Sequence, residues 1–129
     1  MSILRHISPR RIRAPFARYS HAVEVSAPSR WLLCSGQLGI SHTDAIPKSI
    51  EDQASLCFEA IGACLADANM SFADVVRLNA YVTDREAMGA YMAVRDRYVA
   101  APPPASTLVI VSGFTRPEFK VEVEAIAAK

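Results

Sequence analysis

The chain has 129 residues, of which 51% are hydrophobic and 21% charged, and its formal net charge at pH 7 is +1. This length predicts one domain, residues 1–129, that buries roughly two-thirds of its unfolded surface. The near-neutral charge excludes a global field that would recruit nucleic acid or an anionic membrane. No apolar run approaches the roughly 20 residues that a transmembrane helix needs. We therefore expect a soluble globular protein.

The N-terminal segment is basic, with five arginines and no acidic residue in the first 23 positions. Such a start is compatible with a mitochondrial transit peptide or a basic arm that binds RNA. Pro9 and Pro15 interrupt any amphipathic helix. We therefore favour a solvated arm that leads into the first strand.

Two short strands are predicted at residues 22–26 and 31–36, followed by a loop over 37–48 with room for a short extra strand. A helix is expected from about Ile50 to Asn69, where Ser49 with Asp52 resembles a capping box. Apolar residues recur in this helix at helical spacing and define one buried face; they are Ile50, Ala54, Cys57, Ile61, Cys64, Leu65 and Ala68.

The chain has three cysteines, an odd number, which argues against a disulfide framework. This favours a reducing, cytoplasmic environment. Cys57 and Cys64 lie about 10 Å apart along the predicted helix axis, too far for a disulfide. We assign both to the core. Cys34 precedes Ser35 and Gly36 near the end of a predicted strand. No pair of cysteines or histidines has the spacing of a zinc site, so we expect no metal.

Residues 74–83 alternate between apolar and polar positions and predict a strand. A second helix is expected over about Glu86 to Ala100, capped by Thr83 or Asp84. The prolines at 102–104 end it. Its buried stripe is Met88, Tyr91, Met92, Arg95 and Tyr98.

Two strands are predicted at the C-terminal end, over 107–111 and 121–127. The first is apolar on both faces, so we expect it to be covered on both sides. The second alternates, with valines and alanines on one face and Glu122 and Glu124 on the other. Because burying a bare carboxylate costs several kcal/mol or more, Glu122 is a candidate functional residue.

The element order β-β-(β)-α-β-α-β-β predicts an α+β protein with a single mixed sheet and both helices on one face. The other face also carries apolar residues, namely Trp31 or Leu33 and one side of 107–111. Monomers rarely expose a large apolar patch. We therefore predict that self-association covers this face.

Polar residues near strand ends form a candidate site: Tyr19, Ser20, Ser35, Gly36, Gln37, Ser106, Thr107 and Glu122. Each also has an ordinary structural explanation, such as packing for Tyr19, a turn for Ser35 and β-propensity for Thr107. A Ser–His triad is not supported, because serines adjacent to a histidine in sequence need not be close to it in the fold. A glycine-rich phosphate loop is absent.

Five blocks are similar, in content and order, to signatures of the RidA/YjgF family, also known as L-PSP endoribonucleases. They are YSHAV (19–23), CSGQLG (34–39), DVVRLNAYVTD (74–84), PPAST (103–107) and VEVEAIA (121–127). The resemblance implies a chorismate-mutase-like fold, a homotrimer with three small-molecule clefts between subunits, and no cofactor. It also makes the basic arm part of the family pattern rather than a cleaved peptide.

Family members of the deaminase type hydrolyse imines and enamines, such as 2-aminoacrylate, to keto acids and ammonia. An arginine after a Pro-Ala pair grips the substrate carboxylate bidentately, which suits its geometry. A glutamate in the last strand positions or activates water. By motif, that glutamate is Glu122, the family tyrosine is Tyr19, and the serine before Gly-Gln is Ser35.

The chain departs from this pattern at the carboxylate clamp. Ser106 stands where deaminases have arginine, and Leu108 stands where they have cysteine or threonine. Met92 replaces a substrate-contacting asparagine. Losing a buried bidentate partner costs several kcal/mol of carboxylate binding, so the usual imino acid should bind poorly. Arg18 and Arg116 are candidates for a substitute cation.

Three interpretations follow from the resemblance. The first is a hydrolase of a different C=N compound, and the second is a module that binds a metabolite without turnover. The third is a ribonuclease, which we rank lowest because near-neutral charge and the lack of a stacking platform predict weak RNA affinity. We therefore expect a small-molecule ligand, and neither membrane nor nucleic acid as a partner.

Overall fold

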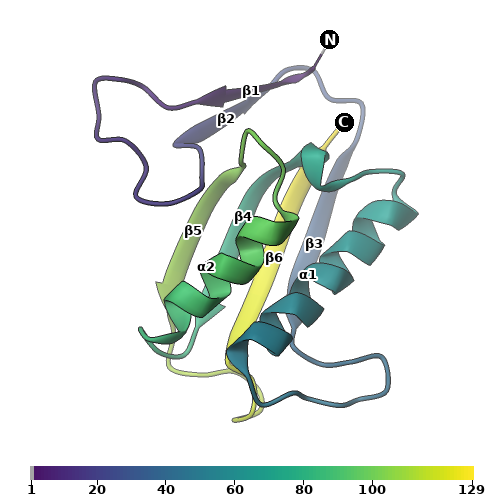
Figure 1. The fold of residues 1–129 in the computed structure, drawn as a ribbon. Helices are drawn as coiled ribbons and strands as arrows, with labels where there is room; N and C mark the ends of the chain where they lie inside the picture. Colours follow the sequence, from purple (N-terminus) through teal and green to yellow (C-terminus); the bar gives the residue numbers. More distant parts are fainter. Residues whose placement is uncertain (1) are drawn as a thin grey trace.

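The computed structural model describes residues 2–129 and contains two layers, a four-stranded sheet and two helices that cover one of its faces (Figure 1). The elements are β1 (Leu4–Ile7), β2 (Ala22–Val25), β3 (Trp31–Leu38), α1 (Ile50–Asp67), the 3-10 turn η1 (Phe72–Asp74), β4 (Val75–Val82), α2 (Ala87–Tyr98), β5 (Ala105–Ile110) and β6 (Val121–Ala128). The α+β class, the mixed sheet and the placement of both helices on one face are thereby confirmed.

The strand order in the main sheet is β3-β6-β4-β5. Strand β6 runs antiparallel to β3 and to β4, whereas β4 and β5 are parallel. The parallel pair is connected through α2, since parallel strands need a crossover rather than a hairpin. Because β5 stands at one end of the strand order, it is an edge strand. The prediction that it is covered on both sides is wrong for the single chain, in which Val109 and Ile110 are exposed.

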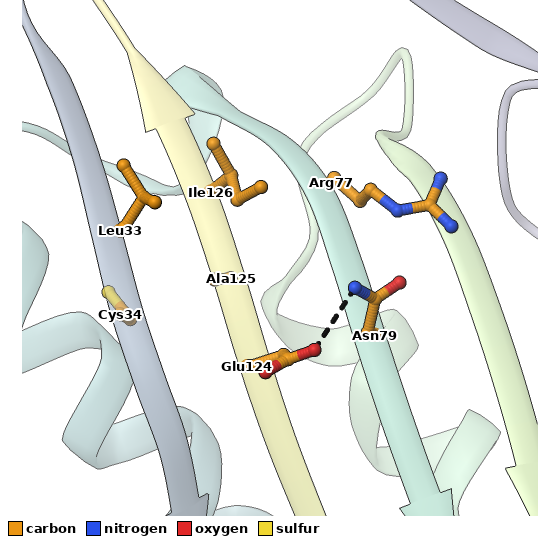
Figure 2. A pocket seen from close by; sticks show the side chains of 7 residues that line it. All are labelled: Leu33, Cys34, Arg77, Asn79, Glu124, Ala125 and Ile126. Atoms are coloured by element: carbon orange, nitrogen blue, oxygen red, sulfur yellow. Dashed lines mark hydrogen bonds between the residues drawn. The ribbon is translucent and has the colours of Figure 1, made fainter.

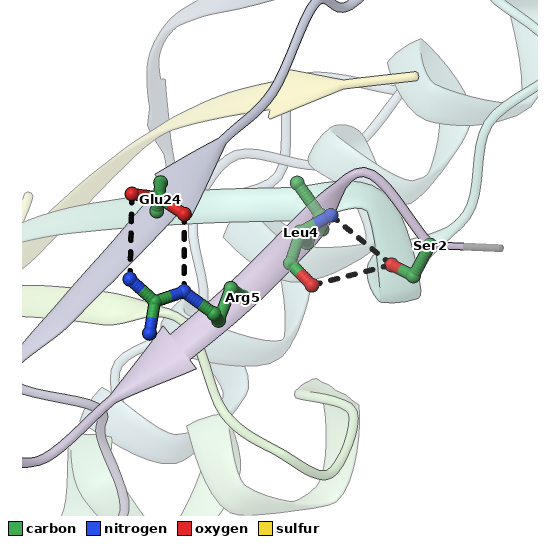
Figure 3. A network of polar contacts seen from close by, with 4 residues as sticks. All are labelled: Ser2, Leu4, Arg5 and Glu24. Atoms are coloured by element: carbon green, nitrogen blue, oxygen red, sulfur yellow. Dashed lines mark hydrogen bonds and ion pairs between the residues drawn. The ribbon is translucent and has the colours of Figure 1, made fainter.

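Strands β1 and β2 form a separate antiparallel ribbon beyond one end of the main sheet (Figure 1). Arg5 Nε donates a hydrogen bond to Glu24 Oε1 at 3.0 Å across this pair, and Ser2 contacts Leu4 beside it (Figure 3). Two predictions are therefore wrong: the basic arm contains a strand, and residues 22–25 do not join the main sheet. The pairing joins segments far apart in the chain, so local periodicity does not reveal it.

The helix boundaries differ from the predicted ones at several ends. Ser49 Oγ accepts a hydrogen bond from the Asp52 amide at 3.1 Å, so Ser49 caps α1. The helix ends two residues before Asn69, which adopts a positive φ of 56° and stops it. The N-cap of α2 is Glu86, which makes no side-chain cap bond, rather than Thr83 or Asp84; Asp84 Oδ1 nevertheless accepts a hydrogen bond from the Ala87 amide at 2.9 Å, in the turn before the helix. The segment after β3 contains no extra strand.

The core lies between the helices and the sheet. Helix α1 packs on β3 and β6, and its residues Phe58, Ile61 and Leu65 are buried in the core. The ring of Phe58 stacks on that of Tyr98 at 5.1 Å between centroids. Cys57 is fully buried, and this burial raises the pKa of its thiol to about 12. Within residues 2–129, neither helix has the length and apolar character needed to cross a bilayer.

Gln53 is a fully buried polar residue that ties three segments together. Its Nε2 donates to the carbonyls of Pro47 and Glu118 at 2.8 and 2.9 Å, and its Oε1 accepts from the Lys120 amide at 2.8 Å. These bonds attach the loops around the start of β6 to α1. They thereby fix the strand that carries Glu122.

We expect Gln53→Leu to lower the free energy of unfolding by about 1–3 kcal/mol, because three backbone groups lose the partner that this buried side chain provides. Denaturant titration at fixed protein concentration measures this. The matched control is Gln37→Leu, since Gln37 makes one local bond to the Ser35 carbonyl; its effect should be within about 0.5–1 kcal/mol. Equal effects of the two substitutions would contradict the assigned role of Gln53.

Candidate functional site

One group of predicted site residues meets on the sheet face opposite the helices. The pairing of β3 with β6 runs from Cys34–Ala125 to Gln37–Val123, so Ser35 and Gly36 together oppose one residue. This two-against-one arrangement is a β-bulge, a feature common beside active sites. A methyl group added to Gly36 would lie 2.6 Å from Cδ of Glu122. Glycine at this position therefore lets the Glu122 carboxylate lie against the bulge.

The two carboxylates of β6 have different surroundings. Glu124 Oε1 accepts a hydrogen bond from Tyr81 Oη at 2.7 Å. It also accepts one from Asn79 Nδ2 at 3.2 Å, beside a small cavity of about 150 Å³ (Figure 2). The bond to Glu124 raises the pKa of Tyr81. No side chain within residues 2–129 donates a hydrogen bond to the Glu122 carboxylate. Glu124 is held in a polar cluster, whereas Glu122 is available to a ligand or water.

A second group of predicted residues meets on the helix-covered face. A cavity of about 350 Å³ lies between α2, β5 and the segment before β2. Its lining comprises Phe16, Ala17, Tyr19, Met88, Met92, Arg95, Ser106 and Leu108. Ser20 Oγ donates to the Pro103 carbonyl at 2.6 Å and thereby fastens the Tyr19 segment near the start of β5.

The two proposed substitute cations do not line this cavity. Arg18 donates to the carbonyls of Asp96 and Val99, at 3.4 and 3.5 Å, and so binds the end of α2. Arg116 lies 5.9 Å from the ring centroid of Phe119 in the loop before β6. The cavity is instead lined by Arg95, which we predicted to lie in the buried stripe of α2 without a functional role. An arginine in an otherwise apolar stripe was the available signal.

The two groups lie on opposite faces of one sheet. Tyr19, Met92 and Ser106 line the helix-side cavity, whereas Ser35 and Glu122 lie on the open face. Thr107 also lies on the open side, where its hydroxyl accepts from Arg77 Nη2 at 2.7 Å. A single chain therefore does not bring Ser106 and Glu122 into one pocket.

The open face is also apolar and uncovered at its β3 edge. The side chains of Trp31 and Leu33 are 53% and 71% exposed. They pair with Ala128 and Ile126, whereas Glu122 pairs with Leu38 at the other end of the same two strands. Large exposed apolar residues on one sheet face favour an interaction surface. Within residues 2–129, no three His, Cys, Asp or Glu side chains are grouped as metal ligands would be.

Comparisons with known proteins agree on one family. The profile of the family described as Endoribonuclease L-PSP matches residues 10–129. The protein DfrA of Myxococcus xanthus is 34% identical over 111 residues, which are 84% of this chain and 83% of DfrA. TdcF of Escherichia coli, provisionally named a reactive intermediate deaminase, is 28% identical over 74% of this chain and 76% of TdcF.

Solved structures agree with the sequence comparisons. The crystal structure of YyfB from Yersinia pestis, a protein of unknown function in the conserved Rid family, superimposes with a TM-score of 0.86. The superposition covers 98% of this chain and 99% of YyfB, with 26% sequence identity. The fold similarity therefore extends over nearly the whole chain.

Proposed function

Since the chain belongs to the endoribonuclease L-PSP (RidA/YjgF) family, we propose that it hydrolyses an imine or enamine other than the usual 2-imino acid. The observation that carries this proposal is the free Glu122 carboxylate beside the Ser35–Gly36 bulge. The provisional naming of TdcF as a reactive intermediate deaminase supports the reaction class.

The proposed reaction needs water and no cofactor. Glu122 accepts a proton from a water molecule as the water oxygen bonds to the C=N carbon, and returns that proton to the nitrogen, which gives a neutral carbinolamine. Glu122 then transfers the hydroxyl proton of the carbinolamine to its amine nitrogen, the C–N bond breaks, and the carbonyl product and ammonia leave. The Ser35 hydroxyl, which is exposed beside the carboxylate, is positioned to bind the substrate.

The substrate class follows from Ser106, which stands where the resemblance implies a carboxylate-binding arginine. A hydroxyl does not supply the charge and the paired N–H donors of a guanidinium. We therefore propose a C=N substrate that has no carboxylate at that position.

We further propose that the complete site forms between subunits of a homotrimer. A cyclic oligomer places one face of a subunit against a different face of its neighbour. Such contacts bring Glu122 of one copy toward the Ser106 cavity of the next. They also cover Trp31 and Leu33, whose exposure supports the proposal.

Mixing two inactive variants tests this arrangement. Glu122→Gln removes the base, and Ser106→Trp fills the cavity. Random mixed trimers should have about one quarter of their interfaces with both halves intact. We expect ammonia release to recover to about that fraction when the variants are co-refolded, measured with imines formed in situ by oxidation of amines and amino acids.

Two outcomes would overturn the proposal. Mixed trimers without recovery would place the site within one chain. A wild-type protein that binds a metabolite but accelerates no imine hydrolysis above the uncatalysed rate would instead be a binding module, the second interpretation of the sequence.

A further inference from the structure

Arg95 is the most deeply buried charged residue of α2, with a side chain that is only 3% exposed. Removing a guanidinium from water is costly unless its charge and N–H groups find partners. This side chain lies in the wall of the 350 Å³ cavity, where Ser106 also lies. The unfavourable burial of this charge therefore occurs at the proposed ligand site.

The protein satisfies only part of the hydrogen-bonding capacity of Arg95. Its Nε donates to Asp96 Oδ1 at 3.1 Å. Nη2 lies 3.0 Å from the same oxygen but is not aligned for a hydrogen bond, and it has no other partner within residues 2–129. The guanidinium carbon lies 6.0 Å from the centroid of the Tyr91 ring. A guanidinium has five N–H donors, so most remain for another acceptor.

The surroundings of Arg95 select the kind of acceptor. The other cavity walls are mainly apolar and include Met88, Met92 and Leu108. Asp96 already balances part of the arginine charge, so a ligand with one negative charge fits better than a dianion. A carboxylate accepts two parallel N–H bonds from a guanidinium, and an apolar remainder would pack on the methionines.

We propose that Arg95 is a specificity-determining residue that binds the carboxylate of a small organic acid whose remainder is apolar. This inference deepens the proposed function, on whose ligand cleft it rests. The carboxylate is anchored from α2 rather than from the start of β5. It is therefore displaced from the location implied for the family arginine, which changes which acids place their C=N carbon near Glu122.

Isothermal titration with isobutyrate, its neutral analogue isobutyramide and inorganic phosphate tests the inference on the wild-type protein. We expect isobutyrate to bind, and isobutyramide and phosphate to bind at least about tenfold more weakly. In Arg95→Gln, isobutyrate binding should fall about tenfold or more. The control is Arg97→Gln, which makes the same change on the same helix but contacts Ser55 outside this cavity; it should bind as wild type.

Several outcomes would overturn the inference. They are unchanged isobutyrate binding in folded Arg95→Gln, equal binding of isobutyramide, or binding of phosphate in place of isobutyrate. If Arg95→Gln does not fold, NMR of the wild-type arginine side chains decides. The Arg95 Nε–H signal should shift with isobutyrate and not with isobutyramide, and an unmoved signal overturns the proposal. Because isobutyrate has no C=N bond, these results are independent of whether imine hydrolysis occurs.

Discussion

Replacing Glu122 by glutamine should lower the rate of enzyme-dependent ammonia release by about 10²- to 10⁴-fold, the usual contribution of a general base. Glutamine has nearly the same shape but does not accept a proton from water. Because no side chain within residues 2–129 donates a hydrogen bond to the Glu122 carboxylate, the substitution should leave the fold intact. Ammonia release from the best imine of the panel measures the effect.

The matched control for this experiment is Glu124→Gln, two residues along the same strand. Glu124 is held by Tyr81 and Asn79, so its substitution should lower stability by about 1 kcal/mol. It should nevertheless retain most of the activity, since Glu124 is not the proposed base. Activity that survives Glu122→Gln, or is lost equally in both variants, would show that Glu122 is not the base.

Introducing an arginine at Ser106 should raise hydrolysis of 2-aminoacrylate by about 10²-fold or more, because a buried charge partner contributes about 2–5 kcal/mol. In the wild-type cavity, the new guanidinium would share about 350 Å³ with Arg95. Repulsion between these two cations should limit the gain. The double substitution Arg95→Gln with Ser106→Arg should therefore exceed the single one in kcat/KM.

Ser106→Ala serves as the control, because it changes the same position without adding charge. It should show no gain toward 2-aminoacrylate. A folded Ser106→Arg protein of unchanged oligomeric state that also shows no gain would mean that the cleft differs from the deaminase pattern at more than this residue. The isobutyrate binding data for Arg95 then distinguish two explanations. Either the substrate carboxylate is bound in the wrong place, or no base lies near the C=N carbon.

Local patterns predicted much of this fold. The alternation in residues 121–127 placed Glu122 and Glu124 opposite the buried valines, as observed. Helical spacing identified Ala54, Cys57, Ile61 and Leu65 as buried residues of α1, and Ser49 marked its start. It missed the buried Gln53 and Phe58, and it included Ile50, Cys64 and Ala68, which are only half-buried. The correct predictions hold because the direction of a side chain depends on its own helix or strand, whose period is visible in the sequence.

The enclosure of Arg95 is a feature that such patterns do not predict. A charged residue in an apolar stripe is normally expected to extend its head group to water. Here, the segment around Phe16 to Tyr19 lies over the end of α2, and the guanidinium is enclosed. No property of α2 alone predicts that cover, because it comes from a segment about 80 residues earlier in the chain.

The sequence by itself determined the family, the α+β class, the two helices on one face and the candidate residues Tyr19, Ser35, Ser106 and Glu122. Only the tertiary structure decided that β1 pairs with β2, that Ser106 and Glu122 lie on opposite faces, and that Arg95 enters the cavity. The physical reason is range: periodicity reports on neighbours within one element, whereas strand order and the enclosure of a site depend on contacts between distant segments.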